Sequence, residues 1–355
     1  MNKDNNDSGH MNKDNNDSGI SYALYSTYRG VLMGLSMLSI ILFHYCEDCC
    51  TDQYHYNAVI RFFHTYFGSS AVDIFLLLSG FGLYYSAKRN RDFSFRHYYV
   101  HRLAKVLVPY FIVAIPALIW RDVIIESRSF FYAIGDLFFA YFFISGRRFY
   151  WYILAISICY IMFPYFFNII DSASDDITAQ MRTILMYCLS SLICLLFYLF
   201  LKDSYDKLEA LMLRIFPFIF GVYLGRLGFQ HNPIKLQTYL FASLSIPIMF
   251  LRKGAPIFMV RNMQFFLSLF VTMLVILAFY VFHGFGKIGS ALNWIGKYTL
   301  EIYLCHVTVR AVMTIKGYHL SSIKLELLQI CIAAVLSAIL HIVVAWIYKV
   351  VPSQV

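Results

Sequence analysis

Charged side chains are scarce in this sequence. Asp, Glu, Lys and Arg make up 14% of its 355 residues, whereas apolar and aromatic residues make up 60%. A soluble globular domain typically has about one-quarter charged residues. The shortage of charge therefore excludes an ordinary water-soluble fold and predicts a protein whose outer surface faces lipid.

Long polar stretches are also missing between the apolar runs, which leaves no room for a separate soluble domain. A helix needs about 20 mostly apolar residues to cross the roughly 30 Å hydrocarbon layer. We therefore expect an all-α, polytopic integral membrane helical bundle of about 10–11 transmembrane helices, with residues 21–355 as its single domain. Eleven apolar runs approach the required length: 30–46, 70–87, 103–120, 129–146, 149–170, 183–201, 213–229, 236–251, 262–283, 296–315 and 325–348.

The first twenty residues contain no apolar leader. They repeat a polar decapeptide, MNKDNNDSGH followed by MNKDNNDSGI. Such a segment has nothing to bury, and it lacks the basic, apolar and small-residue order of a cleaved signal peptide. We predict that residues 1–20 form a disordered tail and that the first membrane helix directs insertion.

Basic residues outnumber acidic ones and give a net charge of +9. They stand in short clusters between the apolar runs, a pattern typical of topology signals rather than of nucleic-acid binding. The connection 88–105 is the most basic, and loops of this kind are retained in the cytoplasm. This predicts a multi-pass protein with its N-terminus inside. With eleven helices, the C-terminus and the acidic group Asp171, Asp175 and Asp176 lie outside, whereas Arg147, Arg148, Lys202 and Lys207 lie inside.

A second pair of metal-type cysteine spacings is missing. The one cluster among eight cysteines is Cys46, Cys49 and Cys50, with His55 nearby. A single CxxCC spacing is a weak sign of a metal site. We predict no metal, and we interpret the cluster as packing or a disulfide.

Titratable residues inside the apolar runs are candidate site residues, because a charge in the hydrocarbon layer is costly unless it faces a partner or a water-filled cavity. The rise of 1.5 Å per residue from Arg29 puts His44 about 22 Å across the layer. The same rise puts Asp73 about 5 Å below the outer boundary, so the two depths nearly match. A carboxylate beside an imidazole favours its action as a general base. We therefore predict a catalytic His44 and Asp73, with a packing role for the histidine as the alternative.

Three further titratable residues, Glu301, His306 and Arg310, lie in the run 296–315. His306 and Arg310 share one helix face at i, i+4 spacing. A structural ion-pair network and a supporting role beside the catalytic residues explain the trio equally well.

The segment FSFRHYYVHRLAKVLVPYF places Arg96, Arg102 and Lys105 among aromatic residues. One interpretation is contact with lipid headgroups at the inner surface. The other is a site for the phosphates of a nucleotide-like donor such as coenzyme A, since arginine and lysine bind phosphate and aromatic rings stack on a base.

Five segments in sequence order resemble the acyltransferase 3 family of polytopic membrane proteins, which O-acylate bacterial surface glycans and related acceptors. The most specific is AVDIFLLLSGFGLYYS, which is similar to the family's VDxFFxLSGF segment. The others are GLSMLSIILFHYC, RHYYVHRLAKVLVPYF, FYWYILAISICYIMFPYFF and LNWIGKYTLEIYLCHV.

This resemblance implies an O-acyltransferase of the bacterial cytoplasmic (inner) membrane. The implied donor is acyl-coenzyme A, with acetyl favoured by the family's habit, and no cofactor is tightly bound. The implied acceptor is a sugar hydroxyl of a surface polysaccharide or a lipid-linked glycan, acylated directly or after the acyl group passes to the enzyme. Membrane lipids are the other expected partners.

The resemblance also assigns roles to residues. His44 corresponds to the family's essential histidine, and Arg96, Arg102 and Lys105 would bind the donor's phosphates. Trp151 and Tyr152, from the tryptophan-containing segment, would support the site. This chain has Met33 where the family has an arginine, eleven residues before the histidine, and Arg29 shares a helix face with that position. Arg29 is therefore a further candidate for donor binding.

Two other classes of function stay open. A transporter or flippase of a glycan precursor would also have many helices with buried titratable groups, but the sequence has no inverted repeat. A scaffold protein would leave the buried Asp73 and Glu301 unexplained.

Overall fold

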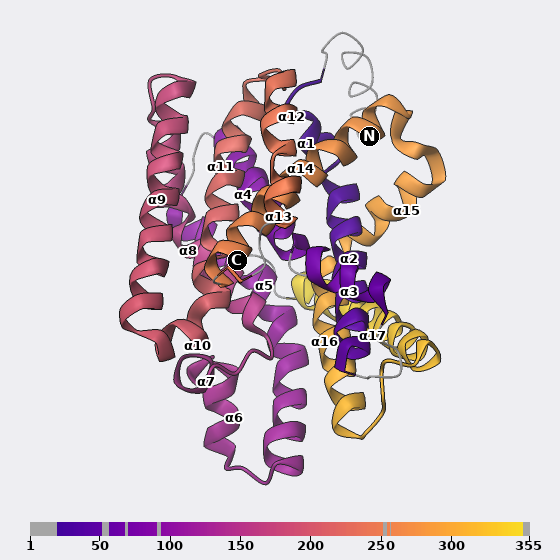
Figure 1. Ribbon diagram of the computed structural model, residues 1–355. Helices are drawn as coiled ribbons and strands as arrows, with labels where there is room; N and C mark the ends of the chain where they lie inside the picture. The colour runs from indigo at the N-terminus through magenta and orange to yellow at the C-terminus, as the bar shows by residue number, and fades with distance from the viewer. Residues whose placement is uncertain are drawn as a thin grey trace, which may run out of the picture.

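The computed structural model describes residues 20–51, 57–67, 70–90, 94–250, 254–255 and 257–350. The regular elements in these ranges are helices, which confirms the predicted all-α bundle (Figure 1). The predicted tail, residues 1–20, lies outside the described residues except for Ile20. His55 lies outside them as well.

Eight of the described segments are long and apolar enough to cross a membrane. They are α2 (Arg29–Thr51), α4 (Ser70–Arg89), α5 (Phe95–Leu118) with the π-helical segment η1 (Ile119–Ile125), α8 (Trp151–Asp171), α9 (Asp176–Phe200), α10 (Lys202–Met212) with α11 (Ile215–Phe229), α14 (Ile257–Val281) and α17 (Ile323–Val350). The shorter helices are α1 (Leu24–Thr27), α3 (Ala58–Phe67), α6 (Phe130–Leu137), α7 (Ala140–Ser145), α12 (Leu236–Ser243), α13 (Ser245–Phe250), η2 (His283–Phe285), α15 (Gly286–Lys297) and α16 (Thr299–Ile315).

The expected membrane helix at 129–146 is wrong. The segment forms two short helices, α6 and α7, separated where Phe139 adopts a left-handed conformation with φ of 62°. Eight helical residues extend only about 12 Å at 1.5 Å per residue, far less than the hydrocarbon layer. In Figure 1 the two helices lie together at the bottom of the bundle.

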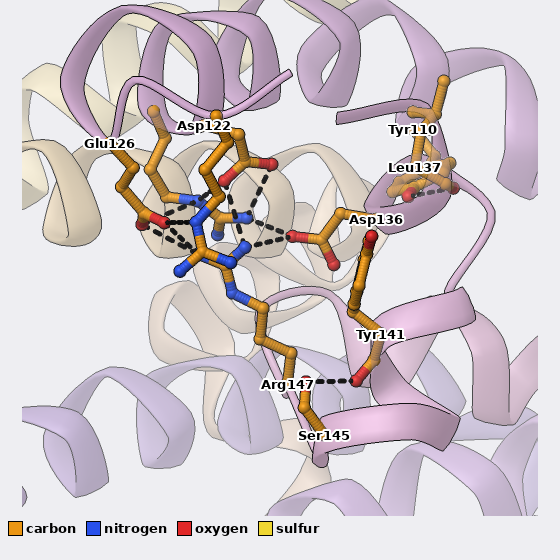
Figure 2. Close-up of polar contacts among 10 residues, drawn as sticks. Tyr110, Asp122, Glu126, Asp136, Leu137, Tyr141, Ser145 and Arg147 are labelled. Carbon is orange, nitrogen blue, oxygen red and sulfur yellow. Dashed lines mark hydrogen bonds and ion pairs between the residues drawn. The ribbon is translucent and has the colours of Figure 1, made fainter. Parts of the chain in front are cut away.

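An ion-pair cluster holds α6 and the segment after α7 to η1. Arg121 of η1 binds Asp122 and Asp136, and Arg147 binds Asp122, Asp136 and Glu126. Figure 2 shows Arg147 reaching from the segment after α7 towards these carboxylates. Burial raises the pKa of Asp136, and the two guanidinium groups oppose that rise. Asp136 therefore joins the short helix α6 to η1 and to the segment after α7, and it does not lie within a membrane crossing of its own.

The loss of one crossing changes which connections share an end of the bundle. Lys88 pairs with Asp171 at 3.1 Å, and Arg226 pairs with Asp176 at 3.3 Å. These residues mark one end, called the Lys88 end below. Tyr348, near the end of α17, donates a hydrogen bond of 3.0 Å to the carbonyl of Ala104, near the start of α5. The predicted separation of Asp171 and the C-terminal region from the 88–105 connection is therefore wrong.

The opposite end of the bundle, called the Glu47 end, brings together the end of α2 and the start of α4. Arg310 pairs there with Glu47 at 3.0 Å, and Arg214 pairs with Asp73. Arg148, from the 129–150 region, pairs with Glu209 of α10 at 3.2 Å. Arg147 and Arg148 thus lie at the end opposite to Lys88, contrary to the prediction that they share its side.

Small residues let the central helices approach closely. A Cβ atom added to Gly80 of α4 would collide with the carbonyl oxygen of Phe218 on α11, and one added to Gly221 would collide with that of Leu77. Glycine at a helix crossing permits this backbone contact. A hydrophobic core cluster around it includes residues from Tyr25 to Val344. The single domain over 21–355 stays a prediction.

No disulfide joins the cysteines in the described ranges, and Cys46 and Cys49 are buried. The Cys49 thiol donates to the carbonyl of Ser321 at 3.7 Å. Of the two interpretations of this cluster, the structure supports packing and not a disulfide.

Candidate functional site

A cavity of about 400 Å³ opens at the Glu47 end between α2, α16 and the segment that leads into α8. Its lining combines aromatic rings with charged groups, which suits a ligand that has both polar and apolar faces. The residues that line it are Ile40, Phe43, His44, Glu47, Val72, Arg148, Phe149, Trp151, Tyr152, Ala210, Arg214, Arg261, Tyr303, Val307, Arg310 and Ala311.

His44 faces this cavity from α2. Its Nδ1 atom lies 3.0 Å from Nε2 of His306 on α16, and the two rings stack with centroids 5.2 Å apart. Nε2 of His44 has no hydrogen-bond partner among the described residues, so it is the nitrogen that can meet a ligand. The site therefore has an imidazole pair rather than a single histidine.

Gln329 of α17 fixes the second imidazole of this pair. Its Nε2 atom donates to the carbonyl oxygen of His306 at 3.0 Å and lies 3.0 Å from Nδ1 of the same residue. Gln329 and His306 are both buried, and Oε1 of Gln329 is buried without a hydrogen-bond partner among the described residues. Gln329 was not predicted from the sequence, although an amide within the apolar run 325–348 is a signal of the same kind as a carboxylate in such a run.

Asp73 is not the partner of His44. It is 1% exposed, and its Oδ1 atom binds Arg214, at the start of α11. Arg214 lines the cavity, but Asp73 does not. His44 and Asp73 were predicted at nearly the same depth, but depth along a helix does not determine the direction in which the side chain points. Asp73 therefore orients an arginine and leaves the imidazole to His306.

The three titratable residues of the run 296–315, Glu301, His306 and Arg310, do not lie together. His306 contacts His44, and Arg310 lines the cavity while it pairs with Glu47 and Asp48. Their predicted shared face is confirmed. Glu301 lies elsewhere, 3.2 Å from Nδ1 of His341 on α17, and it does not line the cavity.

The aromatic wall of the cavity comes from the start of α8. Trp151 and Tyr152 line it as the resemblance implied, together with Phe149. The guanidinium of Arg121 lies over the ring of Phe149 at 4.4 Å from its centroid. The ion-pair cluster of Figure 2 therefore supports this wall from behind, because Arg121 and Arg147 both belong to it.

Two further cavities follow α2 towards the Lys88 end. The second, of about 110 Å³, shares Ile40, Tyr152 and Tyr303 with the first. The third, of about 540 Å³, shares Arg29 with the second. The three cavities thus lie in succession from Arg29 to His44, a distance of about 22 Å along the helix.

The predicted donor-binding residues separate into two groups. Arg29 lines the second and third cavities, and a Cβ atom at Gly82 would lie 2.9 Å from its Cζ atom. Arg102 donates to the hydroxyl of Ser86, which lines the third cavity, at 3.0 Å. Arg96 and Lys105 are exposed and line none of these three cavities.

Residues missed at the first cavity are Arg148, Arg214 and Arg261. They lie just before or at the start of apolar runs, and basic residues at such positions are typical of topology signals. Their contribution depends on Glu209 and Asp73, which pair with them from behind the cavity wall. Only the tertiary structure brings these groups together.

Comparison with known protein families identifies the family of this chain. The family model Acyl_transf_3, described as an acyltransferase domain, matches residues 31–346, which is nearly the whole chain. Neither the curated proteins nor the solved structures gave a match. With this match and eight apolar helices long enough to span a bilayer, the chain belongs to the acyltransferase 3 family and is a multi-pass membrane acyltransferase.

Proposed function

We propose that this enzyme transfers an acyl group, acetyl in the favoured case, from acyl-coenzyme A to a sugar hydroxyl of a surface polysaccharide or a lipid-linked glycan. The observation that carries the proposal is the succession of three cavities along α2. Arg29 lies at one end of this succession, and the imidazole pair lies at the other. Such an arrangement suits a donor and an acceptor that approach from opposite faces of the membrane.

In this proposal the Lys88 end faces the cytoplasm of a bacterial inner membrane, because the most basic connection lies there. Arg29 and Arg102 hold the donor's phosphates in charge-assisted hydrogen bonds. The exposed Arg96 and Lys105 attract the anionic donor to the opening. The acyl end of the pantetheine arm then reaches along α2 towards His44.

His44 acts as the general base. The acceptor oxygen attacks the thioester carbonyl carbon while the hydroxyl proton moves to Nε2 of His44. The carbon–sulfur bond then breaks, and the departing sulfur of coenzyme A takes that proton. An ester forms on the sugar, and free coenzyme A stays at the Lys88 end.

The hydrogen bonds of the imidazole pair determine whether Nε2 of His44 is free of a proton and can accept one from the acceptor hydroxyl. Gln329 presents an amide N–H to Nδ1 of His306, which places the proton of His306 on Nε2 and leaves His44 protonated on its own Nε2. For His44 to accept a proton, both ring protons move to Nδ1. Gln329 then turns its amide so that the unpartnered Oε1 accepts from His306. Gln329 is thus a positioning residue for the base.

Substitution of Gln329 tests this condition. In Gln329→Met no group can accept from Nδ1 of His306, and we expect kcat to fall about tenfold, or about 1.4 kcal/mol in the barrier, with little change in KM for the donor. In Gln329→Glu a carboxylate accepts that proton, so kcat is retained and its pH dependence changes. The measurement is a pH profile of kcat; full activity of the methionine variant at every pH contradicts the positioning role.

Arg29 is tested without replacing it. In Gly82→Ala the new Cβ displaces the Arg29 guanidinium, a flexible group, so the helices keep their packing. We expect KM for acyl-coenzyme A to rise about tenfold, with kcat and the thermal midpoint nearly unchanged. The matched control is Gly80→Ala, which collides with backbone on α11 and lowers the thermal midpoint. A KM that is unchanged in Gly82→Ala argues against Arg29 as a donor ligand.

The function itself is tested with purified protein in detergent. A ligand that binds only the folded state raises its apparent stability, so acyl-coenzyme A should raise the thermal midpoint. In vesicles, labelled acyl groups should appear as esters on added glycan. A flippase would move the glycan without forming an ester and would be unaffected by coenzyme A.

A further inference from the structure

One wall of the first cavity carries more positive charge than its partners neutralise. Arg148 and Arg261 share a single carboxylate, that of Glu209, at 3.2 and 3.1 Å. Arg214 pairs with Asp73. Three arginines thus face two carboxylates, which leaves one positive charge in excess on the arginine wall, as we call Arg148, Arg214 and Arg261.

The carboxylates of this wall lie behind it. Glu209 and Asp73 are 5% and 1% exposed, and neither lines the cavity, whereas all three arginines do. Of the three guanidinium nitrogens of Arg214, only Nη1 has a hydrogen-bond partner among the described residues. A guanidinium has five N–H donors, so Arg214 keeps donors for a ligand although the residue is 4% exposed.

Another part of the cavity lining has the reverse imbalance, with two carboxylates for one arginine. Arg310 pairs there with both Glu47 and Asp48, at 3.0 and 2.6 Å. His44 and the rings of Trp151 and Tyr152 line the same cavity. A ligand that complements this arrangement is a sugar whose ring packs on the aromatic side chains and whose anionic group meets the arginine wall.

We propose that the acceptor is an anionic sugar, whose carboxylate or phosphate binds Arg148, Arg214 and Arg261 and directs a hydroxyl to His44. This inference rests on the proposed function and specifies its acceptor. The excess charge is costly in a partly desolvated cavity unless an anion compensates it, and guanidinium groups bind carboxylate and phosphate in bidentate geometry. The group belongs either to the glycan itself, as a uronate, or to the phosphate that links the sugar to a lipid.

The experiment compares three acceptors that differ in the anionic group: methyl glucoside, methyl glucuronoside and glucose 1-phosphate. Each is incubated with the purified enzyme and labelled acetyl-coenzyme A. We expect at least one anionic acceptor to have a KM about tenfold below that of the neutral one. A preference for the glucuronoside identifies a carboxylate of the glycan, and a preference for the sugar phosphate identifies a linking phosphate.

Arg148→Gln tests whether the excess charge of the arginine wall binds the anionic group. In this variant Glu209 keeps Arg261 as its partner and Asp73 keeps Arg214, so two arginines face two carboxylates. We expect this variant to lose the tenfold preference without a change in KM for acetyl-coenzyme A. The control is Arg128→Gln, since Arg128 is 42% exposed against 40% for Arg148, pairs with Glu126 and does not line the cavity. Equal use of neutral and anionic acceptors by the wild type overturns the inference, as does a change in donor KM alone in Arg148→Gln.

A binding measurement separates this inference from the proposed function. Methyl glucuronoside or glucose 1-phosphate, without any donor, should raise the thermal midpoint of the wild type but not of Arg148→Gln. If it does so while no acceptor is acylated, the anion site stands and the proposed function fails. If acylation proceeds and neither anionic sugar protects the wild type more than methyl glucoside does, the anion site fails.

Discussion

Replacing His44 with glutamine is expected to reduce acyl transfer by a factor of about 10² to 10⁴, the usual contribution of a general base. Nε2 of His44 is the nitrogen of the imidazole pair that is left for a substrate at the first cavity. Glutamine keeps a polar group beside His306 but cannot accept the hydroxyl proton. The measurement is ester formation on the glycan under saturating donor, with the thermal midpoint as a check on folding.

The matched control for this substitution is His341→Gln. His341 is also a histidine of a membrane helix with one hydrogen-bonded partner, Glu301, but it is away from the three cavities. We expect it to retain nearly full activity. If His44→Gln retains more than half of the wild-type rate, the imidazole pair has a packing role and the base must be sought elsewhere.

Replacing Asp73 with alanine is expected to destabilise the protein by about 3–5 kcal/mol, because it leaves the buried Arg214 without its counter-ion. Asp73 and Arg214 are 1% and 4% exposed, and the pair joins the start of α4 to the start of α11. The measurement is the free energy of unfolding in detergent micelles, or the thermal midpoint if unfolding is irreversible.

The double variant Asp73→Ala with Arg214→Met tests whether the instability of Asp73→Ala comes from the unpaired charge of Arg214. Removing both charges and keeping an apolar chain of similar length should restore most of the lost stability. The double variant should therefore fold. It should bind an anionic acceptor more weakly than the wild type, because Arg214 belongs to the arginine wall. Equal instability of the single and double variants contradicts the assignment of Asp73 as a counter-ion.

Composition and run length predicted the bundle, because the hydrophobicity and length of a segment largely determine whether it can cross the membrane. The runs that became α2, α4, α8, α14 and α17 have few charges and the right length. The run 129–146 has a similar composition, but its fate depended on Arg121 and Arg147, which bind Asp136 from outside the run. No local property of the segment contains that information.

Only part of the candidate site was predicted, because part of it depends on contacts between distant segments. A histidine in an apolar helix is visible in a sequence, and His44, His306 and Arg310 meet at one end of the bundle. The partner of His44 is set by the rotation of α2 and α16 about their axes, and that rotation is decided by packing across the whole bundle. Asp73, at a similar depth, was therefore the wrong prediction for the partner of His44, and Gln329 was not predicted.

Tyr152 and Tyr303 line both the first and the second cavity, and their rings meet edge to face with centroids 5.2 Å apart. A passage wide enough for a pantetheine chain would also conduct protons if it stayed open and wet. Because the two rings lie where these cavities meet, the proposed donor would have to pass beside their apolar faces, and the same faces would limit the entry of water and ions along that route.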